Sequence, residues 1–275
     1  MRSPRPRPWL HLALLPLLLG AAEPLRVVSL NPSLTATVVA LGAETSLVGV
    51  DEWSAKQQPA ARDLPVVGGL FTPSLEAVVA LEPDLVVLVP GVQQRDLRDR
   101  LRALGIEVLE LPNIALADLL ASIERLGERL GRGEAAARRV AEIRAAWDAA
   151  ARESAGRARP RAVLVIQREP LYVVGAGSFL DDMLRAAGGE NAAARFGEAY
   201  PRVGIEWLIE AAPEVILDAS DDPLEPRAYW ARWPSLPAVA AGRVVRISEQ
   251  VMLPGPYPDR GLAVLSQTLG GGTPH

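Results

Sequence analysis

The chain has 275 residues, of which 49% are hydrophobic and 23% are charged, and its formal net charge is −4. This length and composition fit a folded protein of about two domains. Binding to nucleic acid needs a basic face, which the acidic balance excludes. Because the sequence contains no cysteine, disulfides, thiolate metal sites and cysteine nucleophiles are excluded as well.

The first 22 residues have the order of a cleavable secretory signal. Arginines at positions 2, 5 and 7 precede an apolar run from Trp9 to Leu19, and small residues follow at positions 20–22. As a helix, this run is too short to span the ~30 Å hydrocarbon core of a bilayer. We therefore expect export with cleavage near Ala22, and loss of the three arginines lowers the net charge from −4 to −7.

Residues 23–115 alternate short apolar strands with helices, which predicts an N-terminal α/β lobe. A mostly parallel sheet covered on both faces is the expected arrangement. The predicted strands are Arg26–Leu30, Leu47–Val50, Val66–Val67, Leu85–Val89 and Glu107–Leu111. The predicted helices are Leu34–Leu41, Leu75–Leu81 and Gln94–Leu104.

Residues 116–157 carry apolar side chains at the three-and-four spacing of an amphipathic helix. Gly131 and Gly133 interrupt this pattern and are poor helix formers. We therefore predict one helix ending near Leu130 and a second, Ala- and Arg-rich helix starting near Glu134. About twenty residues of the second helix would span some 30 Å, the width of a small domain.

Residues 158–275 return to alternating strands and helices, which predicts a C-terminal α/β lobe. The predicted strands are Arg161–Gln167, Tyr172–Val174, Val215–Leu217 and Val244–Ile247, and the predicted helices are Phe179–Ala187 and Asp259–Leu269. A weak internal repeat relates the two lobes, since a glutamate lies seven positions before a proline and a β-branched strand in each. The pairs are Glu76 with Pro83 and Glu206 with Pro213. The predicted fold is α/β, with two Rossmann-like lobes joined by a single long helix and a ligand cleft between them.

Five aromatic residues lie in or beside loops expected at the carboxyl ends of the strands, where ligands of α/β sheets bind. They are Trp53, Phe71, Tyr172, Tyr200 and Tyr257. Aromatic faces offer broad apolar contact, and the indole and phenol groups add one polar atom each. A cleft lined in this way suits a large, flat, partly polar ligand. The alternative is that these rings cap the ends of the sheets as ordinary core residues.

Catalytic motifs are scarce in this sequence. Both histidines, His11 and His275, lie outside the predicted folded body, so a histidine-dependent triad or zinc site is excluded. The glycine groups match neither a phosphate-binding loop nor a GxGxxG turn. A pair of acids for glycoside hydrolysis stays open as an alternative. We expect no enzyme, and therefore no catalytic residue, no bound metal and no cofactor.

The order of motifs along the chain carries a resemblance to a known family. These motifs are the leader, Arg26–Ser33, Val48–Val50, Pro73–Glu76 with Pro83–Val86, the long helix and Gly188–Asn191. In this order the chain resembles the periplasmic substrate-binding proteins of ABC importers for vitamin B12, haem and iron-siderophores, and most closely the B12-binding type. The resemblance implies a periplasmic monomer in which one long helix limits the opening of the cleft.

The resemblance also implies a membrane partner. In the family, a glutamate on each lobe docks on arginines of the permease dimer, which works with its ATPase subunits. Glu76 and Glu206 occupy the matching positions of this sequence. The alternative is that both acids only favour a helix N-terminus electrostatically.

Cobalamin is the ligand that the resemblance favours. Trp53, Tyr172 and Tyr200 match positions that contact cobalamin in the B12-binding relative, and Phe71, Arg202 and Tyr257 complete the predicted ligand set. Val89 and Ile166 stand where that relative has rings.

Other ligands and classes stay open. A ferric siderophore would need several arginines, for which Arg168, Arg202 and Arg260 are the candidates. Haem is a further alternative, because Tyr257 could bind its iron. An exported chelatase-like or redox protein, or a structural protein with an empty cleft, would belong to a different class.

Overall fold

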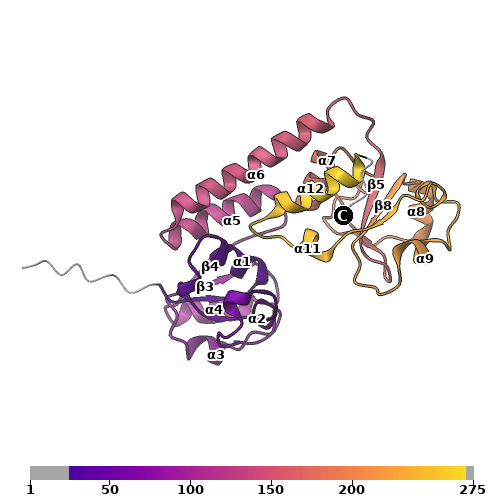
Figure 1. The fold of residues 1–275 in the computed structure, drawn as a ribbon. Helices are drawn as coiled ribbons and strands as arrows, with labels where there is room; N and C mark the ends of the chain where they lie inside the picture. The colour runs from indigo at the N-terminus through magenta and orange to yellow at the C-terminus, as the bar shows by residue number, and fades with distance from the viewer. Residues whose placement is uncertain (1–24, 271–275) are drawn as a thin grey trace, which may run out of the picture.

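Two α/β lobes connected by a helical segment make up the computed structural model, which describes residues 25–270 without the side chains of Glu249 and Gln250 (Figure 1). The predicted leader, residues 1–22, lies outside the described residues. Each lobe has its own, mostly parallel sheet, so the predicted fold class is confirmed.

The N-terminal lobe contains a four-stranded parallel sheet in the order β2-β1-β3-β4. Its strands are β1 (Val27–Ser29), β2 (Leu47–Val50), β3 (Leu85–Leu88) and β4 (Glu107–Glu110). Its helices are α1 (Pro32–Ala40), α2 (Glu52–Gln57), α3 (Leu75–Val79) and α4 (Arg95–Ala103), with 3₁₀ turns at Glu44–Ser46 and Pro59–Ala61. Side chains of β3 alternate between a cluster with α1 and a cluster with α3 and α4, so both faces of the sheet are covered.

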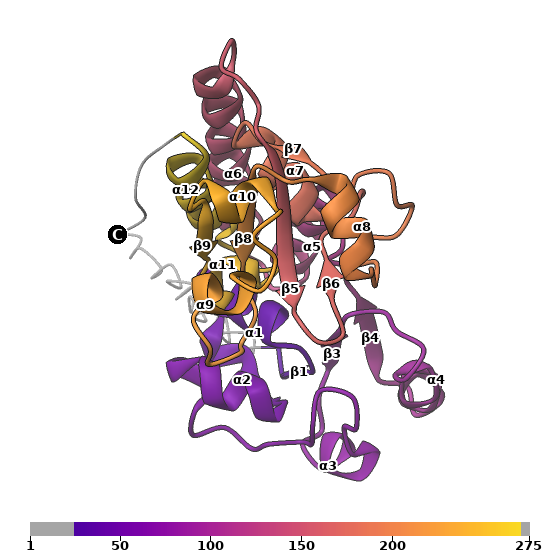
Figure 2. The ribbon, with the colours of Figure 1, turned by 90° about the vertical axis from the view of Figure 1, so that its right-hand side faces the viewer.

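The C-terminal lobe has a second sheet in the order β6-β5-β8-β9, in which β6 is antiparallel and β7 also pairs with β5. Figure 2 shows β9, β8, β5 and β6 from left to right. The strands are β5 (Arg161–Gln167), β6 (Tyr172–Val173), β7 (Glu190–Asn191), β8 (Val215–Asp218) and β9 (Val244–Arg246). The helices are α7 (Phe179–Ala186), α8 (Ile205–Ala211), α9 (Pro226–Trp230), α10 (Pro237–Ala240), α11 (Glu249–Met252) and α12 (Pro258–Leu269).

The connecting segment consists of α5 (Leu116–Arg129) and the 22-residue α6 (Gly133–Ser154). The predicted break between them is confirmed, and Gly131 adopts the left-handed φ of 65° that ends α5. The two helices pack so closely at Gly127 that a side chain there would collide with Ala136. From this pair, α6 continues to the C-terminal lobe, where Ala150 joins the core between the sheet, α7 and α12 (Figure 1).

The internal repeat predicted from sequence has a structural counterpart. Glu82 and Ala212, which precede the two equivalent prolines, have φ values of 45° and 43°. Such values are uncommon for residues other than glycine. In addition, each lobe has a backbone N–H at the start of its first strand that donates a hydrogen bond to the acid following the equivalent proline. These bonds join Arg26 to Asp84 and Arg161 to Glu214, both at 2.8 Å.

Some local predictions were wrong or incomplete. The strand predicted at Val66–Val67 is a single bridge between Val66 and Val50, because Pro65 and Gly68 limit its extension. The helices α2, α9, α10 and α11 and the strand β7 were not predicted. They contain two to six residues each, which is too short to show a hydrophobic period.

Candidate ligand-binding site

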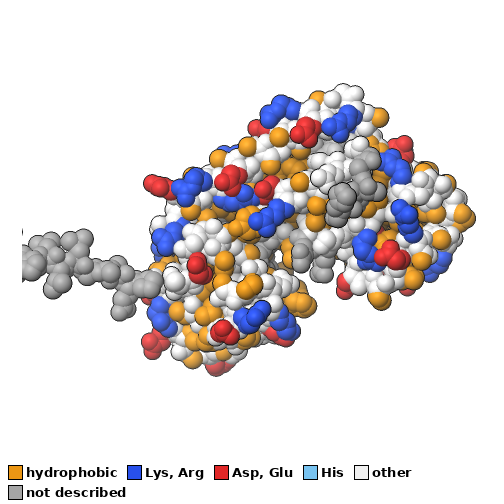
Figure 3. Space-filling model, in the orientation of Figure 1, with side chains coloured by type: hydrophobic (Ala, Val, Ile, Leu, Met, Phe, Trp, Pro, Cys, Tyr) orange, Lys and Arg blue, Asp and Glu red, His pale blue; other side chains and the backbone are white. Residues whose placement is uncertain are grey.

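A cavity of about 620 Å³ lies between the two lobes, and the surface is hollowed there (Figure 3). The N-terminal lobe contributes Asn31 and Trp53, which follow β1 and β2, and the C-terminal lobe contributes residues from the stretch 248–264. The N-terminal wall therefore comes from the carboxyl ends of parallel strands, as expected for an α/β sheet. The volume falls within the ~300–1,000 Å³ of small-molecule sites.

Trp53 is held at the cavity by the capping of α2. The Asp51 carboxylate is fully buried and accepts hydrogen bonds from the backbone N–H groups of Trp53 and Ser54, at 2.9 and 3.1 Å. The hydroxyls of Ser54 and Thr35 lie 2.8 Å apart, and Thr35 donates to Ser29 of β1. This buried network fixes the first turn of α2 against the sheet. The Trp53 ring itself is half exposed and faces the cavity.

A second cavity, of about 520 Å³, is lined by residues of the C-terminal lobe. Tyr172 and Tyr200 line it together with Ile166, Gln167, Leu180 and Met252. Val251 lines the first cavity and Met252 the second, so α11 borders both. Partial burial raises the pKa of Tyr200, because the phenolate is poorly solvated there.

Tyr257 lines the first cavity between two guanidinium groups. Arg260 lies 4.1 Å and Arg139 lies 4.9 Å from the centre of its ring. Arg139 comes from α6, donates to the Pro256 carbonyl at 2.6 Å and pairs with Asp259. The connecting helix therefore holds the cavity wall around Tyr257 directly.

Most polar groups on the cavity walls are neutral. Four carboxamide side chains line the first cavity: Asn31, Gln57, Gln58 and Asn113. Among the residues whose side chains the structure describes, Arg260 is the one charged residue that lines either cavity. Such walls suit a ligand that is largely apolar with neutral hydrogen-bonding groups at its edge.

A family model described as periplasmic binding protein matches residues 27–251. The chain belongs to the periplasmic binding protein family. Among curated relatives of this binding protein, a vitamin B12-binding protein from Salmonella typhi is 30% identical over 227 residues, which cover 82% of the chain and 84% of the relative.

Two solved structures extend the comparison. A periplasmic haem-binding protein from Roseiflexus sp. RS-1 is 26% identical, with a TM-score of 0.77 and coverage of 90% of this chain and 98% of that one. A periplasmic vitamin B12-binding protein from Vibrio cholerae is 24% identical, with a TM-score of 0.76 and coverage of 89% and 96%. This last likeness shows the fold alone. The predicted resemblance is therefore confirmed at the level of the family.

The binding protein brings four of the six predicted ligand residues to its two cavities. Trp53 and Tyr257 line the first cavity, Tyr172 and Tyr200 line the second, and Phe71 and Arg202 line neither. Phe71 is 64% exposed at the tip of a tight loop between Gly68 and Pro73. Arg202 is joined to Tyr172 by a backbone bridge. Contact of Phe71 and Arg202 with a ligand stays a prediction.

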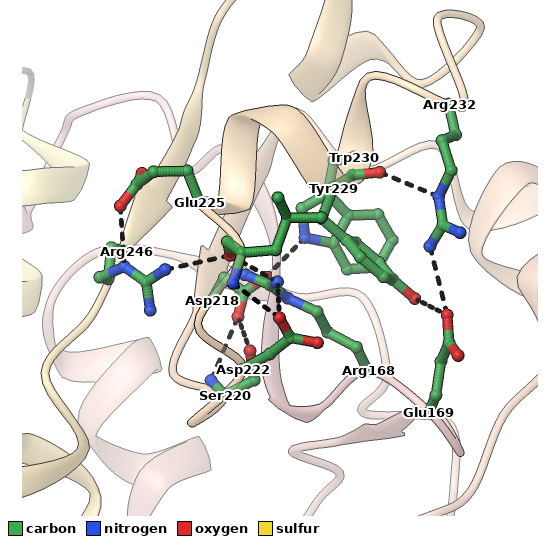
Figure 4. A network of polar contacts seen from close by, with 11 residues as sticks. Arg168, Glu169, Asp218, Ser220, Asp222, Glu225, Tyr229, Trp230, Arg232 and Arg246 are labelled. Atoms are coloured by element: carbon green, nitrogen blue, oxygen red, sulfur yellow. Dashed lines mark hydrogen bonds and ion pairs between the residues drawn. The ribbon is translucent and has the colours of Figure 1, made fainter.

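Arg168, a candidate for binding an anionic ligand, is buried inside the C-terminal lobe, so that prediction was wrong (Figure 4). Its Nε lies 3.0 Å from Asp218 Oδ2, and its Nη1 lies 3.2 Å from Asp222. Asp218 also accepts from the Trp230 indole at 2.6 Å and from the Ser220 hydroxyl at 2.6 Å. The pair ties the ends of β5 and β8 together.

Tyr229 and Glu169 extend this network toward solvent (Figure 4). The Tyr229 hydroxyl donates to Glu169 at 3.1 Å, and the guanidinium groups of Arg168 and Arg232 lie 4.6 and 4.1 Å from its ring. Burial, helped by the bond to Glu169, raises the pKa of Tyr229. These contacts make the network a structural feature of the lobe.

The two glutamates predicted to dock on a permease are both exposed and occupy the first turns of α3 and α8. These helices lie at the far ends of the two lobes (Figure 1). The backbone N–H at the start of α3, and then the Ser74 hydroxyl at 3.1 Å, lower the pKa of Glu76. Glu76 therefore stays ionised. The docking role of Glu76 and Glu206 stays a prediction.

Within residues 25–270, no group of three or more His, Cys, Asp or Glu side chains is arranged to hold a metal ion. Nor does any helix in that range have the length and apolar character needed to cross a membrane.

Sequence reasoning missed the carboxamides that line the first cavity. Gln57 and Gln58 end α2, and Asn113 follows β4. Asn113 follows a predicted strand, so its place at the carboxyl edge could have been inferred. Gln57 and Gln58 carried no such signal, because α2 itself was not predicted.

Proposed function

We propose that this periplasmic binding protein captures cobalamin between its lobes and delivers it to the permease of an ABC importer. The observation that carries the proposal is the composition of the cavity walls. Aromatic rings from both lobes and five neutral carboxamides line them, with Arg260 as the charged member among the described side chains.

Ligand chemistry decides among the three candidate ligands. Cobalamin has a flat corrin ring whose edge carries neutral amide groups, which can exchange hydrogen bonds with Asn and Gln side chains. Haem carries two carboxylates, and many siderophores are anionic. Either ligand would bring negative charge into cavities whose described walls offer one guanidinium to pair with it. Burying an unpaired charge is costly. The wall composition therefore favours cobalamin.

Haem is the second candidate, because solved haem-binding proteins share this fold and three phenol groups lie on the cavity walls. A phenol binds iron as a phenolate. Burial raises the pKa of Tyr200 and so makes its phenolate harder to form. Haem ranks below cobalamin because its two carboxylates would face walls with one guanidinium among the described side chains.

The proposed mechanism is binding and delivery without chemistry. The rings of Trp53, Tyr172 and Tyr257 supply apolar contact, and the carboxamides orient the ligand. The exposed Glu76 and Glu206 present one negative charge at each end of the molecule, where charge steers and orients association. Export to the periplasm by the predicted leader completes this assignment.

The decisive experiment titrates the mature chain, residues 23–275, with cyanocobalamin, haemin and ferrichrome. Intrinsic tryptophan fluorescence and melting temperature are recorded for each, because a ligand of the native state raises the melting temperature. We expect saturable quenching and a rise in melting temperature with cyanocobalamin alone. The variant Trp53→Phe should bind with less quenching. Saturation by haemin or ferrichrome without cyanocobalamin binding would overturn the assignment.

A further inference from the structure

Arg260 differs from the other cation beside Tyr257 in having no ion pair. Its guanidinium stacks on the Tyr257 ring at 4.1 Å and makes no hydrogen bond or ion pair with the residues that the structure describes. Arg139, by contrast, is paired with Asp259 and Glu142 and donates to the Pro256 carbonyl. The Tyr257 ring therefore orients the Arg260 guanidinium, and its N–H donors remain available to a ligand.

The position of Arg260 places these donors at the ligand. Arg260 lies in the first turn of α12, is exposed and lines the first cavity. No carboxylate among the described side chains lines either cavity, so none competes for the guanidinium. A single, unopposed positive charge at a wall of neutral amides matches a ligand with one anionic group among neutral ones.

Cobalamin has this charge pattern. Its corrin ring carries neutral amides, and its one phosphodiester joins the nucleotide loop to the ring. A guanidinium group binds a phosphate through two parallel hydrogen bonds, which a single ammonium cannot reproduce.

We propose that Arg260 binds the phosphodiester of cobalamin and thereby makes the protein selective for corrinoids that carry the nucleotide loop. This inference rests on the proposed function. It names a specificity residue, and it predicts discrimination against corrinoids that lack the loop and its phosphate.

The test measures dissociation constants of cyanocobalamin and dicyanocobinamide by calorimetry. Dicyanocobinamide has the corrin ring but no phosphate and no nucleotide. The proteins are the unsubstituted mature chain, Arg260→Gln, Arg260→Lys and the control Arg152→Gln. Arg152 is exposed on α6 and lines neither cavity, so its substitution changes the net charge equally without touching the site.

For the unsubstituted chain we expect cyanocobalamin to bind about tenfold more tightly than dicyanocobinamide, as one charge-assisted contact provides. Arg260→Gln should weaken cyanocobalamin binding about tenfold and leave dicyanocobinamide binding unchanged, and Arg260→Lys should recover part of the difference. The cyanocobalamin preference should also shrink with added salt.

The outcomes separate this inference from the proposed function. Equal losses for both corrinoids in Arg260→Gln, or no loss for either, would overturn the role of Arg260 while the function stands. An effect of Arg152→Gln as large as that of Arg260→Gln would show a general charge effect and would also overturn it. Failure of the unsubstituted chain to bind either corrinoid would overturn both.

Discussion

Replacement of Trp53 by alanine should weaken cobalamin binding by up to about 60-fold. The Trp53 side chain is 50% exposed without ligand. A large aromatic side chain can bury ~150–250 Å², so about 100 Å² is open for a ligand to cover. At ~25 cal/mol per Å² this area is worth about 2.5 kcal/mol, and each ~1.4 kcal/mol changes affinity tenfold. Calorimetric titration of the mature chain measures the effect.

Phe71→Ala provides the comparison within the same lobe. Phe71 is more exposed than Trp53, at 64%, yet its ring lines neither cavity. We expect its removal to weaken binding less than about threefold, as for a contact outside the central pocket. A smaller loss of cobalamin affinity in Trp53→Ala than in Phe71→Ala would contradict the dependence of affinity on covered ring area. Unchanged melting temperatures of both unliganded variants would show that neither change unfolds the protein.

Two further predictions concern stability and delivery. Asp218→Ala leaves the Arg168 guanidinium buried, with the partly exposed Asp222 as its remaining acid. The free energy of unfolding of the C-terminal lobe, measured in urea, should therefore fall by about 3–5 kcal/mol. Asp222→Ala, the control, should lose less than about 1 kcal/mol, and similar losses for both would refute the role of the buried pair. Glu76→Arg combined with Glu206→Arg should abolish ligand uptake by cells with less than about a twofold change in dissociation constant, because exposed charges orient docking. A parallel fall in ligand affinity would contradict this division of roles.

Much of the architecture was predictable because strong periodic signals carry it. The buried strands β3 and β8 read as short apolar runs, and the connecting helices show a clear three-and-four spacing. The Glu-to-Pro spacing predicted the repeat, and the matching φ values of Glu82 and Ala212 now give it a conformational basis. Long or repeated sequence patterns predict structure without knowledge of tertiary contacts.

The chemistry of the site was less predictable because it depends on burial. Arg168 follows a strand as a ligand-binding arginine would, but Asp218 lies 50 positions later and pairs with it inside the lobe. Helix α2 was hidden because its capping residue, Asp51, was read as part of a loop. A capping acid two residues before Trp53 was a usable signal for the helix, whereas the pairing of Arg168 was not readable from local sequence.

The connecting helix α6 also bears on how far the lobes can move. Arg132, at its N-terminal cap, donates to the Gly42 carbonyl of the N-terminal lobe, Arg139 holds the cavity wall, and Ala150 lies in the C-terminal core. Bending α6 would disturb its hydrogen-bond ladder, so we expect a largely preformed cavity that orders little on binding. X-ray scattering of the mature chain should therefore give nearly the same radius of gyration with and without saturating cyanocobalamin. A clear contraction on binding would contradict a stiff α6 and would indicate hinge closure of the kind seen in many two-lobed proteins.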